Sequence, residues 1–296
     1  MRVPLEMRED RGMAKSRRIT PVLQKAMSDS TSSVERACRI LRALSDPKFD
    51  RLTDIANATE LHKTTVLRVL EVLLHDGFVS RSDRTKRYSL GPELLALGSA
   101  ALRRFDPRPI VQPSLTRLAG LFGDSVMLSI PSGVESVCVD FIEGTYPIRS
   151  NFQSVGSRRP LGVGAGGLAL LAWLPDDVRE AALEVVGQQL KQFPRINVKI
   201  LESMVAETRE RGYAVMLDLA LDNWGGIAVP LLGADGLPVG AIGIGALSER
   251  IRERETQMAN ALKKERALCQ VQWINALTGA GTWKKRKAGK MSSSSG

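Results

Sequence analysis

Apolar residues recur three and four positions apart in the first third of the chain, which is the spacing of one face of an α-helix. They predict a helix that starts after Ser32-Ser33 and stops at Asp46-Pro47. A short helix opened by Thr53-Asp54 follows, and after a turn at Thr59-Glu60 a third helix covers 63–75. Three short helices are therefore expected before residue 77.

The pattern then changes from helical to alternating. Gly77 suits the left-handed position that ends the third helix. Two short strands over 78–80 and 88–90 follow, and the polar segment 81–87 forms the tip of the hairpin between them. Gly91-Pro92 begins a leucine-rich helix, which we interpret as a linker and a natural place for dimer contacts.

Beyond Pro107 the pattern contains both types of element. Helices are predicted near 110–122, 165–174, 176–186, 195–211 and 248–277, and strands near 125–130, 135–142, 146–152, 213–217, 226–232 and 238–245. Asp235-Gly236 predicts a hairpin turn between the last two strands. The fold class is therefore predicted to be α+β, with a winged helix-turn-helix followed by a larger α/β domain.

Charge divides the chain along similar lines. The net charge of +10 is distributed as +3 over 1–30, +4 over 31–105, −2 over 106–279 and +5 over 280–296. The positive excess lies outside the large C-terminal body, which favours a polyanionic partner for the N-terminal part.

Five segments follow from these patterns. We expect a disordered basic arm over 1–30, a winged helix-turn-helix over 31–91 and a linker helix over 92–107. An α/β domain over 108–278 and a disordered basic tail over 279–296 follow.

Composition excludes several classes of protein. No apolar run is long enough for a membrane span, and the N-terminus lacks the apolar stretch of a secretion signal, so we expect a cytoplasmic protein. Cys38, Cys138 and Cys269 are far apart and form no CxxC pair. They are expected to be buried free thiols, neither a disulfide framework nor a zinc site.

The third predicted helix carries the residues expected to read DNA. Lys63, Thr64, Thr65 and Arg68 lie near its start, while leucines and Val66 on the other face point to a core. Such a helix end suits a major groove, where hydroxyls and cations meet base edges and phosphates. Thr64 and Thr65 are the candidates for base contacts, and Lys63 and Arg68 for affinity.

The predicted hairpin tip adds a second group of cations. Arg81, Arg84, Lys86 and Arg87 fit a wing that lies along the phosphate backbone of a double-stranded DNA operator. The alternative is that these charges are merely solvated and that the winged helix docks a partner protein. A mobility-shift assay over a salt series separates the two interpretations.

A glycine-rich segment over 156–167 precedes a predicted apolar helix. Free N–H groups and the positive end of the helix dipole converge there, which favours a carboxylate or another anion. Gly164-x-Gly166 resembles part of a dinucleotide fingerprint, but the required strand, tight turn and ribose-binding acid are not evident. Tight packing of the helix on a sheet through small residues is the remaining alternative.

The residue inventory argues against an enzyme. The two histidines, His62 and His75, both lie in the predicted DNA-binding segment, so the C-terminal domain has none for acid–base or metal chemistry. Cys138 sits in the strand pattern VESVCVDF, where a packed thiol is expected. Asp140, Glu143 and Asp218 show no specific spacing. We expect neither a cofactor nor a metal.

Three stretches of sequence resemble the N-terminal domain of the IclR family of bacterial transcriptional regulators: SVERACRILRAL, LTDIANATELHKTTVLRVLEVLLHDGFV and RYSLGPELLALG. The similarity continues to about Gly279. One departure is Glu60, where the family usually has Gly in the turn; a non-Gly residue there costs about 1 kcal/mol of strain.

The resemblance implies a regulator with a GAF-like α/β domain that binds a small organic acid as effector. Matched motif to motif, the effector-binding residues are Ile148, Ser150, Ala165, Gly166, Met216, Asp218, Gly226, Gly243 and Gly245. It also implies a dimer through the N-terminal domains and linker, with possible pairing of dimers through the effector-binding domains.

The departures from the family's pocket all go one way. Met216 stands where an acid is common, with Asp218 as a nearby substitute, and Gly243 and Gly245 stand where serine is common. These replacements predict a roomier, less polar cavity and a larger ligand with an apolar body, such as an aromatic or branched acid.

Overall fold

The computed structural model describes residues 32–103, 106–148 and 153–290, with side chains described as far as Ala276. The expected basic arm over 1–30 lies outside these residues. Among the described residues, one compact unit comprises 32–110 together with the end of the last helix from 272, and the other comprises 111–271. We call them the N-terminal and the C-terminal unit.

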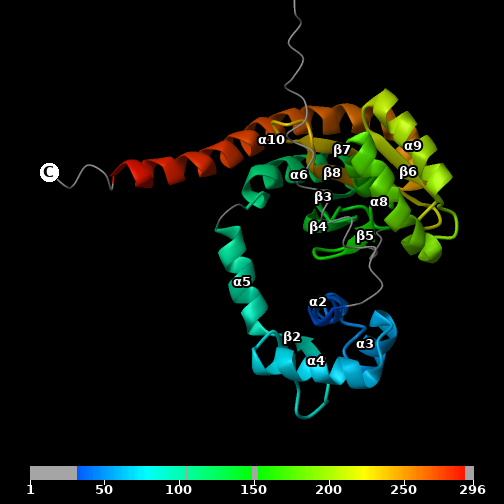
Figure 1. The fold of residues 1–296 in the computed structure, drawn as a ribbon. Coiled ribbons are helices and arrows are strands. Elements are labelled where there is room, and N and C mark those ends of the chain that lie inside the picture. Colours follow the sequence, from blue (N-terminus) through cyan, green and yellow to red (C-terminus); the bar gives the residue numbers. More distant parts are fainter. Residues whose placement is uncertain (1–31, 104–105, 149–152, 291–296) are drawn as a thin grey trace, which may run out of the picture. The chain divides into compact units, whose positions relative to one another are not determined.

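The N-terminal unit is a three-helix bundle with a two-stranded hairpin (Figure 1). Its elements are α2 (Ser33–Ala43), α3 (Leu52–Thr59), α4 (Lys63–His75), β1 (Val79–Arg81) and β2 (Tyr88–Leu90), followed by α5 (Pro92–Leu102). The apolar faces of the three helices form one core around Ile40, Ile55 and Leu70, and the hairpin adds Val79 and Tyr88. This is a winged helix-turn-helix.

The ends of these helices follow local chemistry. Ser32 caps α2, because its Oγ accepts a hydrogen bond from the Glu35 backbone N–H at 3.2 Å. Glu60 ends α3 with a left-handed φ of 56°, as the turn at Thr59-Glu60 requires, and Gly77 takes a left-handed φ of 74° after α4. The prediction that Thr53 opens the second helix is wrong: α3 begins at Leu52 and no side chain caps it.

The C-terminal unit is built on a six-stranded antiparallel sheet with the order β5-β4-β3-β8-β7-β6. The strands are β3 (Ser125–Ser132), β4 (Glu135–Ile142), β5 (Arg158–Pro160), β6 (Ala214–Leu217), β7 (Trp224–Leu232) and β8 (Pro238–Leu247). The helices are α6 (Arg108–Phe122), α7 (Ala165–Ala172), α8 (Asp176–Gln189), α9 (Val198–Arg211) and α10 (Ser248–Lys290), with a 3₁₀ turn at Leu190–Gln192.

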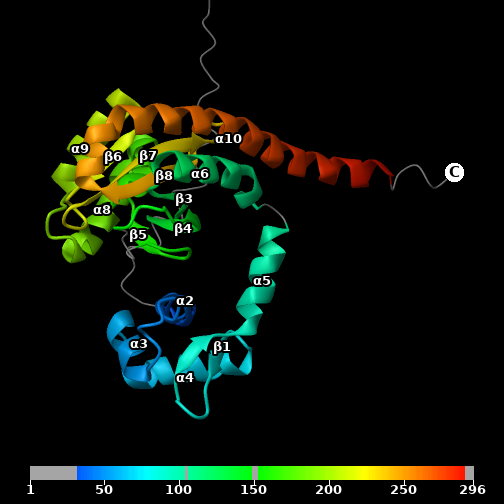
Figure 2. The ribbon, with the colours of Figure 1, turned by 180° about the vertical axis from the view of Figure 1, so that it is seen from behind.

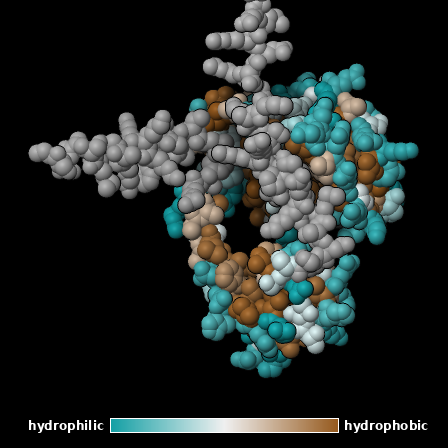
Figure 3. Space-filling model, in the orientation of Figure 1, coloured by the Kyte–Doolittle hydropathy of each residue, from teal (hydrophilic) through white to brown (hydrophobic). Residues whose placement is uncertain are grey.

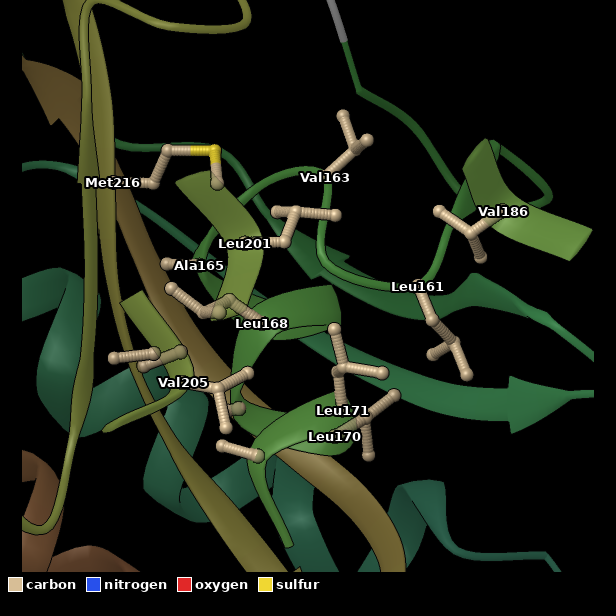
Figure 4. Close-up of a cluster of buried hydrophobic side chains, with 14 of the residues drawn as sticks. Leu161, Val163, Ala165, Leu168, Leu170, Leu171, Val186, Leu201, Val205 and Met216 are labelled. Atoms are coloured by element: carbon tan, nitrogen blue, oxygen red, sulfur yellow. The ribbon is translucent and has the colours of Figure 1, made fainter. Parts of the chain in front are cut away.

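The helices cover the sheet as two layers. On one face α7 packs against β6, β7 and β8 and is itself covered by α9, while α8 adds side chains to the same apolar cluster. Its side chains, with those of α9 and β6, form the apolar cluster of Figure 4. On the other side α6 and α10 run along the sheet (Figures 1 and 2). They are tied together by the Arg117–Glu265 ion pair, in which Nη2 and Oε2 are 2.6 Å apart.

Three predictions fail in this part of the structure. Of the strand predicted over 146–152, residues 146–148 form none, because the Tyr146 N–H bonds the Gly123 carbonyl at 2.9 Å and its ring lies under the Arg250 guanidinium; residues 149–152 lie outside the described residues. The last helix continues to Lys290, beyond the predicted start of a disordered tail. Cys138 and Cys269 are buried as expected, but Cys38 is exposed on α2.

Candidate DNA-binding face and ligand cavity

The recognition helix α4 presents a polar face to solvent. Lys63, Thr64 and Arg68 are exposed and Thr65 is partly exposed, while Val66 and Leu70 are completely buried. The sequence places an apolar residue at every turn on the inner face, which fixes how the helix is rotated about its axis. The four predicted DNA-binding residues of this helix therefore lie on one accessible surface.

The hairpin after α4 places two cations at its tip. Arg84 and Lys86 are exposed and form no ion pair within the described residues. The tip is closed by the Lys86 N–H, which donates to the Ser82 carbonyl at 2.8 Å, and by a left-handed φ of 56° at Lys86. Both side chains are available to a phosphate backbone.

The other two wing cations contact residues of the N-terminal unit. The Arg81 guanidinium lies 5.2 Å from the centre of the Tyr88 ring, and Arg87 Nη1 lies 2.6 Å from Asp50 Oδ2. Asp50 also accepts the Tyr88 N–H through its backbone carbonyl at 2.7 Å. Arg87 thus anchors the base of the wing to the segment before α3, and its role in phosphate binding stays a prediction.

The C-terminal unit has a partly open cavity between α7 and the sheet. Its volume is about 80 Å³. The walls come from the start of α7 and from all six strands, with apolar side chains that include Met127, Phe141 and Trp224. The cavity lies where the sequence predicted a ligand, at the end of the glycine-rich segment.

The first turn of α7 points its N–H groups into this region. Gly164 precedes the helix with a φ of 80°, which glycine adopts without strain, and no side chain caps the helix. The Gly164 N–H donates to Met216 Sδ at 3.2 Å. A weak sulfur acceptor therefore stands where an acidic side chain or a ligand would accept a stronger hydrogen bond.

Most of the predicted effector-binding residues line the cavity. Those that do are Ala165, Gly166, Met216, Gly226, Gly243 and Gly245. Ile148 does not, since it lies outside the strands and is 57% exposed. Ser150 lies outside the described residues.

Asp218 is held away from the cavity by its own partners. Its carboxylate accepts a hydrogen bond from Ser248 Oγ at 2.7 Å and contacts the Arg252 guanidinium. The hydrogen bond from Ser248 is the largest of the effects that hold the pKa of Asp218 below its usual value. This carboxylate ties β6 to the start of α10, so the prediction that it substitutes for a ligand-binding acid is not supported.

Other side chains affect how roomy and how polar the cavity is. Met127 Cε lies 3.2 Å from where a Cβ on Gly245 would be, so a methionine side chain occupies space that the glycine leaves. In addition Ser129, Ser136 and Arg159 line the wall formed by β3, β4 and β5. Sequence reasoning missed all three. Alternation of Ser125, Met127 and Ser129 with buried Val126 and Leu128 was the available signal.

Two other kinds of site are not found in the part of the chain that the structure describes. The described residues contain no group of three or more His, Cys, Asp or Glu side chains placed to hold a metal ion. Nor does any described helix combine the length and apolar character that crossing a membrane requires.

A winged helix-turn-helix with an exposed recognition helix, joined in one chain to an α/β unit that has a cavity, defines a DNA-binding regulator with an effector-binding domain. Comparison with known proteins agrees. Residues 33–83 match the IclR helix-turn-helix domain, and residues 99–269 match the C-terminal domain of the bacterial transcriptional regulator IclR. The chain belongs to the IclR family of bacterial transcriptional regulators, whose members are not enzymes.

Individual relatives support the same assignment over most of the chain. The HTH-type transcriptional regulator XynR of Escherichia coli K12 is 29% identical over 227 residues, which cover 75% of this chain and 89% of the relative. The crystal structure of an IclR-type regulator from Alicyclobacillus acidocaldarius is similar with a TM-score of 0.67 and 27% identity, covering 82% and 98% of the two chains.

A third similar protein was solved with a ligand. It is an IclR homologue from Microbacterium hydrocarbonoxydans in complex with 4-hydroxybenzoate, with a TM-score of 0.64, 22% identity, and coverage of 82% of this chain and 99% of that one. At this identity the likeness concerns the fold.

Proposed function

We propose that this regulator binds an operator through α4 and the wing as a dimer, and that a small organic acid in the cavity of the C-terminal unit controls this binding. The observation that carries the ligand class is the uncapped first turn of α7, which directs backbone N–H groups and the positive end of the helix dipole at the cavity.

The apolar side chains of the cavity support an acid with an apolar body. Phe141 and Trp224 offer aromatic faces, and Met127 and Met216 have flexible side chains that adapt to a ligand's shape. A cavity of about 80 Å³ is small for an aromatic ring. We expect the flexible methionine side chains to adjust when such an acid binds.

The dimer is supported by the composition of α5. This helix has no buried residue in the described chain, although it carries Leu95, Leu97 and Leu102 on its surface. Figure 3 shows apolar surface over it. Exposed apolar surface of this kind marks an interface. Two copies would present two α4 helices to half-sites about one helical turn apart.

The ligand would act through its different affinity for two arrangements of the DNA-binding units. Calorimetry with pyruvate, glyoxylate and 4-hydroxybenzoate tests the ligand class. Mobility-shift assays on DNA upstream of the protein's own gene, over a salt series, test the operator. We expect the aromatic acid to bind more tightly than the two small acids and to change the shift. A preference for glyoxylate would contradict the apolar body, and no shift on any DNA would favour a protein-docking module.

A further inference from the structure

The hydroxyl and guanidinium side chains of the cavity lie on one wall, whereas Gln153 and the Trp224 indole line other parts of it. Ser129 on β3, Ser136 on β4 and Arg159 on β5 all line it. The wall from β7 and β8, by contrast, presents Gly226 and Gly245. The cavity is therefore asymmetric, with hydroxyl and guanidinium donors on the β3–β5 wall alone.

Strand register places these side chains on the same face of the sheet as α7. Ser136 and Arg159 are direct cross-strand partners, so their side chains point the same way. Ser136 Oγ lies 3.2 Å from where a Cβ on Gly167 would be, and Ser129 Oγ lies 3.3 Å from the corresponding point on Gly166. The two hydroxyls lie directly against the first turn of α7.

Both serine hydroxyls lack a partner among the described residues. Ser129 is 3% exposed and Ser136 is 7% exposed, yet neither hydroxyl is hydrogen-bonded there. Ser125 on the same strand differs, because its Oγ accepts the Gly144 N–H at 3.2 Å. Both serines line the cavity, so their hydroxyls are available to hydrogen-bond a ligand bound there.

Arg159 supplies positive charge beside these hydroxyls. Burial lowers the pKa of its guanidinium to about 10, against an opposite effect of the nearby Cys138 thiol, so the group stays cationic at neutral pH. Its five N–H donors form a planar fork that matches a carboxylate. The adjacent Arg158 alternates to the other face, where it bonds Glu135 at 2.8 Å and Ser132 at 2.9 Å.

We infer that Arg159, Ser129 and Ser136 bind the carboxylate of the effector, together with the N–H groups that begin α7, while its apolar body faces Met216 and Trp224. The inference rests on the proposed acid-sensing function and specifies which wall recognises the charge. None of the three residues is among those that family resemblance assigned to the effector.

Calorimetry with matched acids and amides tests this assignment. The probes are benzoate, 4-hydroxybenzoate and pyruvate, each beside its amide, on wild type, Arg159→Gln, Arg159→Lys and Ser129→Ala/Ser136→Ala. We expect about a tenfold to a hundredfold weaker binding of the acids to Arg159→Gln and to the double serine variant, with a smaller loss for Arg159→Lys. Binding of the amides should change little.

Arg158→Gln is the matched control, since it removes the same group one residue away on the opposite face. It should leave acid binding unchanged, and thermal unfolding verifies that each variant is folded. If acids bind wild type and Arg159→Gln equally well, the assignment is overturned while acid sensing stands. If the amides bind wild type but the acids do not, the carboxylate site is likewise refuted. If neither binds, the proposed acid-sensing function itself fails.

Discussion

Glu60 and Lys86 adopt left-handed backbone conformations in the DNA-binding unit, with a φ of 56° at each. A side chain with a Cβ is strained there, whereas glycine is not. Glu60 ends α3 immediately before the recognition helix, and Lys86 closes the tip of the wing. At Lys86 the strained residue supplies an exposed positive charge at the tip of the wing, whereas Glu60 supplies a negative charge, which would not favour DNA binding.

Replacing Glu60 with glycine should therefore stabilise the N-terminal unit. We expect Glu60→Gly to raise its free energy of unfolding by about 0.5–1 kcal/mol, because relief of the left-handed strain exceeds the entropy that glycine adds to the unfolded chain. Urea unfolding of the full chain measures it. Glu60→Ala removes the same charge but keeps the strain, so a gain of equal size in that variant would contradict the explanation.

The wing arginines should differ in what they do for DNA binding. Arg84→Ala removes an exposed cation at the tip, so affinity should fall by a similar factor on all sequences and the salt dependence should lose about one counterion. Arg87→Ala instead breaks the contact with Asp50 and should lower stability by up to about 1 kcal/mol with a smaller change in salt slope. Equal salt slopes for the two variants would refute this division.

The element that defines the cavity, α7, packs closely because its neighbours are small. A Cβ on Gly226 would lie 3.1 Å from the Ala165 Cβ, and one on Gly166 would lie 3.3 Å from Ser129 Oγ. Glycine and alanine at these positions let the helix approach the sheet. Because these side chains are small, the first turn of α7 is also exposed to the cavity.

A bulky residue at the start of α7 should fill the cavity. Ala165→Phe is expected to abolish the ligand response and to lower stability by about 1–3 kcal/mol through overpacking, while binding of the operator persists. Ligand titrations in a mobility-shift assay measure both effects. A response that survives in Ala165→Phe would show that the effector binds elsewhere.

The pairing of α6 with α10 should depend on pH. The hydrogen bond from Arg117 holds the pKa of Glu265 below its usual value of 4.5, although burial of Glu265 opposes it. A carboxylate with a lowered pKa stabilises the fold above its unfolded-state pKa and loses that contribution as pH falls through the folded-state pKa. The stabilisation from this ion pair is therefore complete at neutral pH.

Glu265→Gln should accordingly destabilise the C-terminal unit by about 1–2 kcal/mol at pH 7. The loss is smaller than for a fully buried ion pair, because Arg117 is half exposed and solvent screens its charge. The difference from wild type should shrink as pH falls below about 4. Urea unfolding across this range provides the measurement, with Glu249→Gln, an exposed residue of the same helix, as control. A constant difference down to pH 3 would exclude the ion pair as its cause.

Sequence reasoning succeeded where one local signal dominated. The helix over 63–75 was predicted at its observed bounds because apolar periodicity and Gly77 agree. It failed where tertiary contacts decide: Tyr146 stacks under Arg250 instead of extending a strand, and Asp218 is bound by Ser248. Ser136 and Arg159 were missed because they become neighbours only through the pairing of β4 with β5, which periodicity does not reveal.

For the whole molecule, the exposed leucines of α5 predict an assembly. Leu95 is 76% exposed. Leu95→Glu should shift the protein toward monomers, and operator affinity should fall because two half-sites are no longer bound together. Sedimentation and mobility-shift assays measure these effects. Ala101→Glu adds the same charge about a third of a turn around the helix, and dissociation of that variant alone would place the interface on a different face.

The connection between α6 and β3 is short. Only Gly123 and Asp124 separate the end of α6 from the strand that carries Ser125, Met127 and Ser129 into the cavity. Arg250 clamps this joint, holding both Asp124 carboxylate oxygens at 3.0 Å and the Phe122 carbonyl at 3.1 Å. Because only two residues join α6 to β3, a ligand that displaced β3 would also displace α6, the helix that follows the linker in the chain.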